Sequence, residues 1–437
     1  MDLNNLTDLG KFLYGFGVSR AYFKMLSEND NSKNQIYLGG SFKVLQQLPF
    51  GKIREYPETK NPNYKAPVNL WWINDSGQTA QAPNAQMILY TKYPEVRLSG
   101  FLISCPTAPG EDFRAIKPED RHNNNDKDGR VLIFGVCPDG RIFAFLVRKN
   151  TVLAKTIINE LNDIQSGKTI QEFPLAGIKG TDKTGLLSKL HEIVSIGWHE
   201  SIRLDTNGNK KPYNAKNGGG YTLEALFGIT PNSIAEPDFK GWELKAFSGQ
   251  RITLITPEPD KGFYHERGAK EFALRYGHDA PNVVKYFTGT HKADVYNTTS
   301  NLALVIKGFD YDKGTITDMG GGLHLIDKQN NPVAIWSFNE LLTHWGRKHS
   351  HACYVHYNVE MHNNKIGYVY LSPVYLGEKT ELSLFLKTMQ AGLILYDPAT
   401  KVMLNEKGNT NVKARSQFRI NFNNLTKLYE RFYLENV

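Results

Sequence analysis

The amino-acid sequence predicts an α+β protein made of two domains. The chain has 437 residues, more than the roughly 100–200 residues of an ordinary single domain. Its first part consists of short apolar segments that Asn, Asp, Pro and Gly interrupt, as in a mostly β domain. Its second part mixes such segments with helical periodicity, as in an α/β or α+β domain. We therefore expect domains at residues 1–165 and 185–437, joined by a linker over residues 166–184.

The amino-terminal domain is expected to begin with one helix and to continue with strands. The helix is predicted near Leu6–Leu26, and a second helix, over residues 151–163, closes the domain. Loops are predicted at Asn61–Ala66 and His122–Gly129, where turn-forming residues gather. The predicted strands are Gln35–Leu38, Gln86–Thr91, Glu95–Ser104, Arg130–Val136 and Ile142–Val147.

The carboxy-terminal domain is expected to alternate helices with strands. One helix is predicted to begin near Leu186, and a short one to cover Thr222–Leu226. The run Gly218–Gly220 just before the second helix is expected to be a tight turn. The predicted strands are Gly241–Phe247, Arg251–Thr256, Ala303–Lys307, Ala334–Ser337, Ala352–Met361 and Ile366–Leu371.

Charge and cysteine content indicate the class of protein. The formal net charge of +8 suits a phosphate-rich partner, although many unrelated proteins are as basic. Cys105, Cys137 and Cys353 are widely spaced and odd in number, which argues for a reduced, intracellular protein without disulfides or a thiolate zinc site. The chain shows no secretory signal and no stretch of ~18 apolar residues, so we expect a soluble cytoplasmic protein that does not enter a membrane.

The segment EPDFKGWELK, residues 236–245, contains the candidate catalytic residues. Glu243 and Lys245 are two positions apart, so in a strand their side chains share one face, and Asp238 in the preceding turn can reach the same place. Carboxylate oxygens hold hard cations such as Mg²⁺. Such a cation polarises phosphate and activates water, while a lysine positions the water and offsets developing charge. The order of two acids and a lysine is that of PD-(D/E)xK nucleases.

The short motif also has a simpler reading, because charged residues on strand faces are usually only solvated. Two neighbouring features favour a site. The strand is apolar between its charges, at Trp242 and Leu244. Glu224, on a predicted helix upstream, offers a further carboxylate as a metal ligand or as a support for one.

From about Gly185 to its end, the chain resembles the MvaI/BcnI family of type II restriction endonucleases, relatives of the mismatch-repair nickase MutH. The segments that carry the resemblance are GWHESIR, GGGYTLEALFGI, EPDFKGWELK, TLITPEP, RGAKEFALRYG, WSFNEL and QFRINFNNL, in the order of the family. The resemblance implies a restriction-endonuclease-like fold in which Asp238 and Glu243 bind metal, Lys245 is the catalytic lysine and Glu224 is an additional acidic residue.

The same resemblance indicates where the carboxy-terminal domain meets DNA. Arg419 lies in a segment that contacts bases or phosphates in the family. The preceding segment departs from the pattern: it carries Lys413 and Arg415 where relatives have a histidine and an aspartate, so the recognised sequence need not be the same.

The first ~150 residues resemble the amino-terminal DNA-binding domain of EcoRII, a β-pseudobarrel. The similarity rests on KMLSENDNSKNQIYLGG and QMILYTKYPEVRLSGF. By position Lys24, Glu95 and Arg97 match DNA-contacting arms, and Lys92 is expected to meet phosphates. The alternative is that Glu95 and Arg97 form only a surface ion pair.

These observations predict a type II restriction endonuclease of a restriction–modification system. We expect Mg²⁺-dependent hydrolysis of double-stranded DNA at a short site of the CCNGG kind, such as CCWGG, by a monomer that nicks one strand and then the other without an obligatory protein partner. Two alternatives remain open: a DNA-binding protein that does not cleave, and a strand-specific nickase like MutH.

Overall fold

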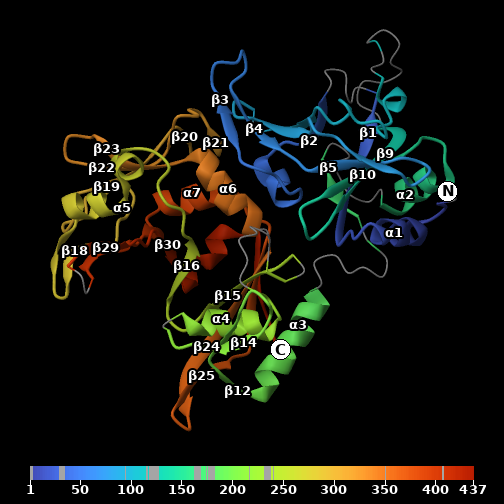
Figure 1. Cartoon of the computed structure of the whole chain (residues 1–437). Helices are drawn as coiled ribbons and strands as arrows, with labels where there is room; N and C mark the ends of the chain where they lie inside the picture. Colours follow the sequence, from blue (N-terminus) through green and yellow to red (C-terminus); the bar gives the residue numbers. More distant parts are fainter. Residues whose placement is uncertain are drawn as a thin grey trace. The chain divides into compact units, whose positions relative to one another are not determined.

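The protein is seen here as a computed structural model that divides into two compact units, Met1–Lys183 and Thr184–Val437 (Figure 1). Each unit has a hydrophobic core of its own. No helix in the described ranges is long and apolar enough to cross a membrane. The structure describes residues 3–28, 35–93, 95–114, 117, 127–161, 169–173, 175, 183–215, 217–230, 238–239, 241–349, 351–405 and 408–437.

The first unit contains two sheets, and most neighbouring strands in them are antiparallel. One sheet has the order β11 (Gln171–Glu172), β1 (Arg20–Ser27), β9 (Lys127–Val136), β10 (Ile142–Val147), β5 (Leu70–Ile73), β6 (Thr79–Gln81). The other has the order β2 (Gln35–Gly39), β8 (Glu95–Ser99), β7 (Gln86–Tyr90), β4 (Asn63–Pro67), β3 (Arg54–Tyr56). Its helices are α1 (Leu6–Gly15) and α2 (Val152–Leu161), with short 3-10 turns η1 (Phe42–Gln46) and η2 (Glu111–Phe113).

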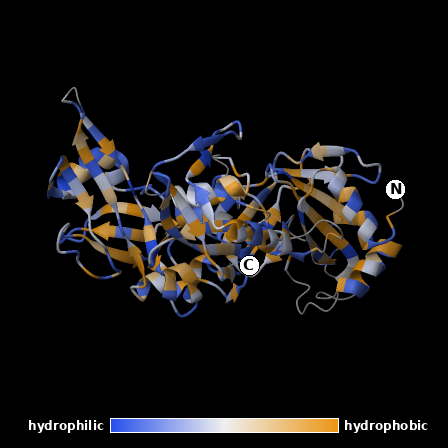
Figure 2. Ribbon diagram, turned by 90° about the horizontal axis from the view of Figure 1, so that it is seen from below, coloured by the Kyte–Doolittle hydropathy of each residue, from blue (hydrophilic) through white to orange (hydrophobic). Residues whose placement is uncertain are grey.

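The core of this unit forms where α1 and α2 pack on the first sheet. Leu9 and Leu13 of α1 are fully buried with Ile157 of α2 and with Ile133 of β9. Figure 2 colours the ribbon by hydropathy and shows apolar and polar residues alternating along the helices and strands. The arrangement follows from side chains that repeat every three or four positions in the helices and every two in the strands.

The early helix is shorter than the sequence predicts. It begins after Asn5, whose side-chain oxygen accepts a hydrogen bond from the backbone N–H of Asp8 over 2.9 Å. It ends at Gly15, and Gly17 adopts a φ of 81°, a left-handed conformation that glycine tolerates and that turns the chain into β1. The prediction of one helix over Leu6–Leu26 was therefore wrong in its second half, which is a buried strand.

Other predicted boundaries also change. The predicted loop Asn61–Ala66 is largely strand β4. Strand β8 ends at Ser99, earlier than expected, because the chain turns and the carbonyl of Phe101 accepts a hydrogen bond from the indole of Trp72. Of the predicted loop His122–Gly129, residues 122–126 lie outside the described residues and the remainder begins β9.

Only part of the expected linker can be described. Residues 166–168, 174 and 176–182 lie outside the described residues. The described part belongs to the first unit, because β11 pairs with β1 while Phe173 and Leu175 are buried in the core of that unit. The segment therefore contributes packing to the first unit.

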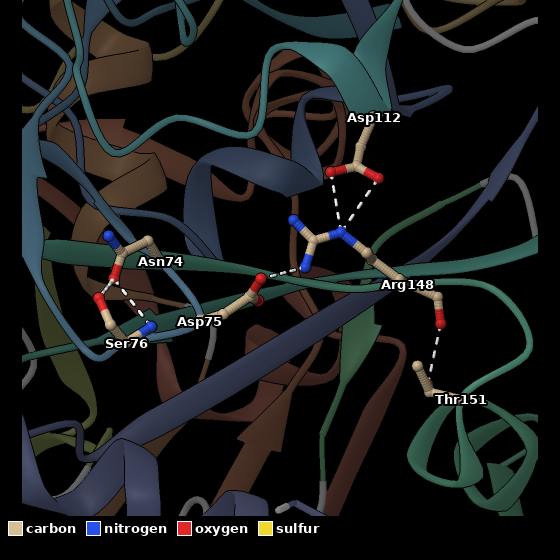
Figure 3. A network of polar contacts seen from close by, with 6 residues as sticks. All are labelled: Asn74, Asp75, Ser76, Asp112, Arg148 and Thr151. Carbon is tan, nitrogen blue, oxygen red and sulfur yellow. Dashed lines mark hydrogen bonds and ion pairs between the residues drawn. The ribbon is translucent and has the colours of Figure 1, made fainter. Parts of the chain in front are cut away.

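A polar network at Arg148 ties three segments of the first unit together (Figure 3). The Nε of Arg148 donates to both carboxylate oxygens of Asp112, over 3.1 and 3.0 Å, and its Nη1 pairs with Asp75. The hydrogen bond that Arg148 donates to Asp75 is the main reason that the pKa of Arg148 is raised. Thr151 donates to the carbonyl of Arg148 and accepts from the N–H of Ala154, which caps α2.

The second unit contains the sheet that holds the predicted catalytic segment. Its order is β12 (Trp198–Glu200), β25 (Lys365–Tyr370), β24 (His351–His362), β26 (Val374–Glu378), β31 (Arg431–Glu435), and β15 (Glu243–Phe247) runs parallel to β24. Helices α3 (Lys183–Ile196) and α4 (Gly218–Leu226) pack their apolar residues on one face of this sheet.

The remaining strands form smaller sheets. One is β16 (Arg251–Ile255), β30 (Phe418–Asn421), β27 (Ile394–Tyr396), and another is β19 (Ala303–Lys307), β22 (Gly322–Ile326), β23 (Pro332–Ser337). A four-stranded sheet has the order β17 (His278–Ala280), β18 (Val283–Thr288), β28 (Ala399–Leu404), β29 (Thr410–Lys413). Two hairpins are β13 (Ile202–Leu204) with β14 (Lys210–Pro212) and β20 (Phe309–Asp310) with β21 (Thr315–Ile316). The helices are α5 (Phe263–Tyr276), α6 (Phe338–Lys348) and α7 (Leu382–Gln390), with the 3-10 helix η4 (Phe422–Leu428).

The predicted strands and helices of this unit are confirmed, but the glycine run before Glu224 is not a turn. Gly218–Gly220 form the first turn of α4. A Cβ on Gly218 would lie 2.1 Å from the hydroxyl oxygen of Tyr368, and one on Gly219 would lie 2.3 Å from the ring of Tyr357. The first two glycines therefore let α4 approach β24 and β25 closely.

Candidate active site

Strand β15 brings the first two predicted site residues together. Glu243 and Lys245 project from the same face, as their spacing predicts. The Nζ of Lys245 donates a hydrogen bond to Oε1 of Glu243 over 2.7 Å. The Glu243 side chain is 4% exposed and that of Lys245 is 22% exposed, so the pair is largely withdrawn from water but Lys245 stays accessible.

Asp238 reaches this strand from the turn that precedes it. The turn is closed by a β-bridge between Phe239 and Trp242, and Gly241 takes a φ of 89° inside it. The Oδ2 of Asp238 accepts a hydrogen bond from the backbone N–H of Leu244 over 2.9 Å. This contact fixes the carboxylate beside the start of β15, next to Glu243.

Glu224 comes from α4, which is fastened to the rest of the unit near that residue. The hydroxyl of Thr222 donates to the carbonyl of Ile202 and accepts from its N–H, each over 3.0 Å. The carbonyl of Gly219 accepts from the hydroxyl of Tyr370 over 2.7 Å. These contacts, with the glycines, place Glu224 within electrostatic reach of Lys245.

The electrostatics link all four residues. Burial alone lowers the pKa of Lys245, but the negative charges of Glu243, Asp238 and Glu224 more than offset it, so the net pKa is raised. Lys245 is therefore an ammonium ion at neutral pH. Three carboxylates facing one ammonium leave a formal excess of two negative charges, which a divalent cation would balance.

The donor chemistry of the site fits a hard divalent metal. Asp238 and Glu243 offer carboxylate oxygens, and Mg²⁺ is usually held by one or two carboxylates together with substrate phosphate and water. Within the described ranges, no group of three or more His, Cys, Asp or Glu side chains is arranged to hold a metal ion by itself.

A pair of buried tyrosines beside Glu243 was not found by sequence reasoning. The hydroxyls of Tyr354, on β24, and Tyr429 lie 2.7 Å apart in a hydrogen bond. Burial raises the pKa of both phenols, and the charge of Glu243 raises it further. Both phenols thus stay neutral next to the carboxylate. No local pattern marks them, because the two tyrosines belong to distant segments that only the sheet brings together.

A cavity of about 310 Å³ opens at the far end of β15. Phe247 lines it from the strand face that also bears Lys245. The ring of Phe247 lies 5.0 Å from the ring of His356 and 5.0 Å from that of Phe422, and Tyr375 lines the same space. The face of β15 that bears Glu243 and Lys245 therefore continues from a charged end into an aromatic end.

The carboxy-terminal residues predicted to meet DNA do not form one cluster. Arg419, on β30, is 27% exposed, and its guanidinium donates to Asp397 over 2.9 Å and to the carbonyl of Arg251 over 3.1 Å. Lys413, at the end of β29, and Arg415, just after it, are exposed. Arg419 is thus held in place by its own chain, whereas Lys413 and Arg415 face solvent.

The amino-terminal residues predicted to meet DNA differ in exposure. Glu95 and Arg97, on β8, form an ion pair of 2.7 Å and remain about a quarter exposed. Lys92 is exposed, with its Nζ 5.7 Å from the centre of the Tyr93 ring. Lys24 is only 3% exposed on β1, so the structure does not offer the surface contact that its position suggested. The neighbours of Lys24 on β1 are buried, which withdraws the whole strand from solvent.

A family model matches most of the carboxy-terminal unit. Residues 187–429 match the MvaI/BcnI restriction endonuclease family. The chain is similar to restriction endonuclease MvaI in complex with its cognate DNA substrate, at 19% identity over 58% of this chain and 98% of that chain, with a TM-score of 0.46. It is also similar to MvaI in the absence of DNA, at 17% identity over 58% of this chain and 97% of that chain, with a TM-score of 0.33. No curated protein matches the chain.

Proposed function

The chain belongs to the MvaI/BcnI restriction endonuclease family, and from that premise we propose that it is a Mg²⁺-dependent type II restriction endonuclease that hydrolyses double-stranded DNA at a short site of the CCNGG kind, such as CCWGG. Family membership makes the chain a site-specific DNA endonuclease. The observation that carries the finer proposal is the convergence of Glu243, Asp238 and Glu224 on the single ammonium of Lys245.

We propose that Asp238 and Glu243 hold the metal and that Glu224 adds negative charge next to it. Bound Mg²⁺ supplies Lewis-acid chemistry, since it polarises phosphate oxygens and makes water more acidic. The hydrogen bond from Leu244 holds Asp238 in place, so one of the two proposed ligands is oriented before substrate arrives.

Lys245 has a different part in this proposal. Its raised pKa keeps the proton on Nζ, so it acts as a hydrogen-bond donor and positive charge and not as a base. Its partial exposure lets it reach a phosphate on one side while Glu243 holds it on the other. An ammonium in that place orients the attacking water and stabilises the charge that develops on the pentavalent phosphorus.

We propose that the amino-terminal unit is an EcoRII-like pseudobarrel that also binds DNA. The exposed Glu95–Arg97 pair supports this, because an arginine held by a carboxylate on a strand presents its remaining donors in a fixed direction. Arg97 would donate to guanine and Lys92 would meet a phosphate. The protein would act in the cytoplasm as a monomer, without an obligatory protein partner, and would cut the two strands in sequence.

The decisive experiment is digestion of unmethylated phage DNA with purified protein and Mg²⁺, followed by sequencing of the ends. Discrete fragments that share one terminal sequence are expected, and their sequence gives the site and the cut position. A time course of cleavage of supercoiled plasmid should show open circles before linear DNA. A reaction that stops at open circles would indicate a MutH-like nickase, and uncut DNA with a clear gel shift would indicate a DNA-binding protein without cleavage.

A further inference from the structure

The four-stranded sheet β17–β18–β28–β29 has one covered face and one open face. On β28, Thr400 and Val402 are 2% and 0% exposed, whereas their neighbours Lys401 and Met403 are partly exposed. Phe287 of β18 is buried on the covered face, with its ring 4.9 Å from that of Phe272 on α5. Helix α5 therefore lies against one side of the sheet and leaves the other side to solvent (Figure 1).

The open face carries a row of side chains that crosses all four strands. The backbone register pairs His278 with Tyr286, Tyr286 with Lys401, and Lys401 with Lys413. Residues that pair directly across strands point to the same side, so these four side chains stand next to one another. We call them the cationic row. The Nζ of Lys401 lies 4.8 Å from the centre of the Tyr286 ring, which shows the contact within the row.

Among the described residues, no ion pair balances the positive charge of Lys401 and Lys413 on this face. The other residues that the register places on it are Thr288, Ala399, Met403 and Asn411, which carry no negative charge. Neither Lys401 nor Lys413 forms an ion pair with any residue in the described ranges. On the covered face, by contrast, Lys285 forms an ion pair of 2.9 Å with Asp279. The open face therefore attracts anions and the covered face does not.

The dimensions of the row suit a nucleic-acid backbone. Four strands at about 4.8 Å spacing span roughly 14 Å. Duplex DNA rises about 3.4 Å for each nucleotide of a strand, so the row extends over about four base pairs. Lysines bind phosphate as point charges and carry no paired donors and acceptors that would identify a base.

We propose that the open face of this sheet binds the sugar–phosphate backbone of duplex DNA and that the cationic row contacts it without reading base sequence. The inference rests on the proposed function, in which duplex DNA is the substrate, and it assigns Lys401, Tyr286 and His278 to DNA contact together with Lys413. Backbone contacts of this kind set affinity and its dependence on salt, whereas the cut sequence is determined by other residues.

Binding titrations at several salt concentrations test this assignment. In the full-length protein, Lys401→Ala and Lys413→Ala are made singly and together, and Kd for a duplex containing the cleavage site is measured in Ca²⁺ without cleavage. Each lost phosphate contact should reduce the slope of log K against log salt by about 0.9, so the double variant should lose about 1.8. Lys401→Arg should keep the wild-type slope of log K against log salt, because the positive charge is retained.

The matched control is Lys285→Ala, which removes the same charge from the covered face of the same sheet. It should leave the slope unchanged. The double variant should still cut at the wild-type sequence, because the row reads no bases, and circular dichroism should show that it is folded.

Two results would overturn the inference while the proposed function stands: a double variant with the wild-type slope, or one that cuts a different sequence. A wild-type protein that neither binds nor cuts duplex DNA would remove the proposed function and this inference with it.

Discussion

Lys245 donates a hydrogen bond to Glu243 from only two positions along the same strand, and this 2.7 Å contact joins the proposed catalytic lysine to a proposed metal ligand. The short sequence separation makes the pair a property of strand β15 itself. Because Glu243 is almost fully buried, the ammonium is what compensates its charge in the protein as it stands. Under the proposed function, cleavage and stability would therefore depend on the same contact.

Loss of a proposed metal ligand should abolish cleavage and spare binding. We expect Asp238→Asn and Glu243→Gln to lower the cleavage rate by about 10²-fold or more, because each removes a charge that serves the transition state. Gel shifts in Ca²⁺ should show DNA affinity within a few-fold of wild type. Glu360→Gln is the control, since Glu360 is exposed and pairs only with His362 among the described contacts. Full cleavage by Asp238→Asn would refute the site.

Removal of the ammonium should cost both activity and stability. Lys245→Met is expected to cut at least ~10²-fold more slowly. It also removes the hydrogen bond that Lys245 donates to the buried Glu243, so the free energy of unfolding should fall by about 1–3 kcal/mol. Urea denaturation measures this. Lys365→Met breaks an exposed lysine–glutamate pair with Glu200 and should change stability by less than about 1 kcal/mol.

Two adjacent glycines of α4 should respond in opposite ways to alanine. Gly219→Ala forces a Cβ to within 2.3 Å of the Tyr357 ring, so we expect a loss of about 1–3 kcal/mol and slower cleavage, since α4 carries Glu224. Gly220→Ala meets no atom within 4 Å and should be neutral or stabilise by up to about 1 kcal/mol. Thermal unfolding of both variants compares the two positions, and equal melting temperatures would contradict the close packing of α4.

Acid should weaken the second unit through His324. Burial, aided by Lys307, lowers the pKa of this histidine to about 4 from an ordinary value of 6.5. Below pH 6.5, His324 binds a proton in the unfolded chain, whereas in the folded protein it stays neutral until about pH 4. The free energy of unfolding therefore falls across that window by up to about 3 kcal/mol. His324→Leu should make the pH profile of urea unfolding less steep but not flat, because burial also lowers the pKa of His291 to about 4. His362→Gln, at a half-exposed histidine, should not.

Arg97 should contribute to DNA binding by the first unit. We expect Arg97→Ala to raise Kd for a specific duplex by about 5- to 100-fold, the range of one good arginine–guanine contact of 1–3 kcal/mol. Arg141→Ala is a close control, because Arg141 also pairs with an acid two positions away, Asp139, in the same unit. An unchanged Kd in both variants would leave Glu95–Arg97 as a surface ion pair.

The parts of the site that lie close in sequence could be predicted, and the parts that depend on strand register could not. The spacing of Asp238, Glu243 and Lys245 places them together whatever the rest of the sheet does, and the structure brings them together as expected. The Tyr354–Tyr429 pair and the cationic row join strands that are distant in the chain. Their pairing is set by tertiary packing, which leaves no local pattern.

The same reason explains the errors in the first unit. Residues 20–27 follow a helix and contain good helix formers, so the helical pattern was extended through them, yet as β1 they lie between β9 and β11. Lys24 is predicted to meet DNA only from its position in the EcoRII resemblance, but its strand lies inside a sheet and the residue is 3% exposed. In such a strand, burial between neighbouring strands determines the conformation more than the intrinsic helix propensity of the residues does.

The parallel pairing of β15 with β24 also sets the earliest point during synthesis at which the proposed active site can form. Strand β15 ends at Phe247, and β24 begins only at His351. A ribosome adding about 5–20 residues per second needs roughly 5–20 s to make the intervening chain. Throughout that interval the proposed metal ligands have been translated, but β15 has no β24 to pair with. The proposed site therefore cannot be assembled before the residues of β24, in the last fifth of the chain, have been made.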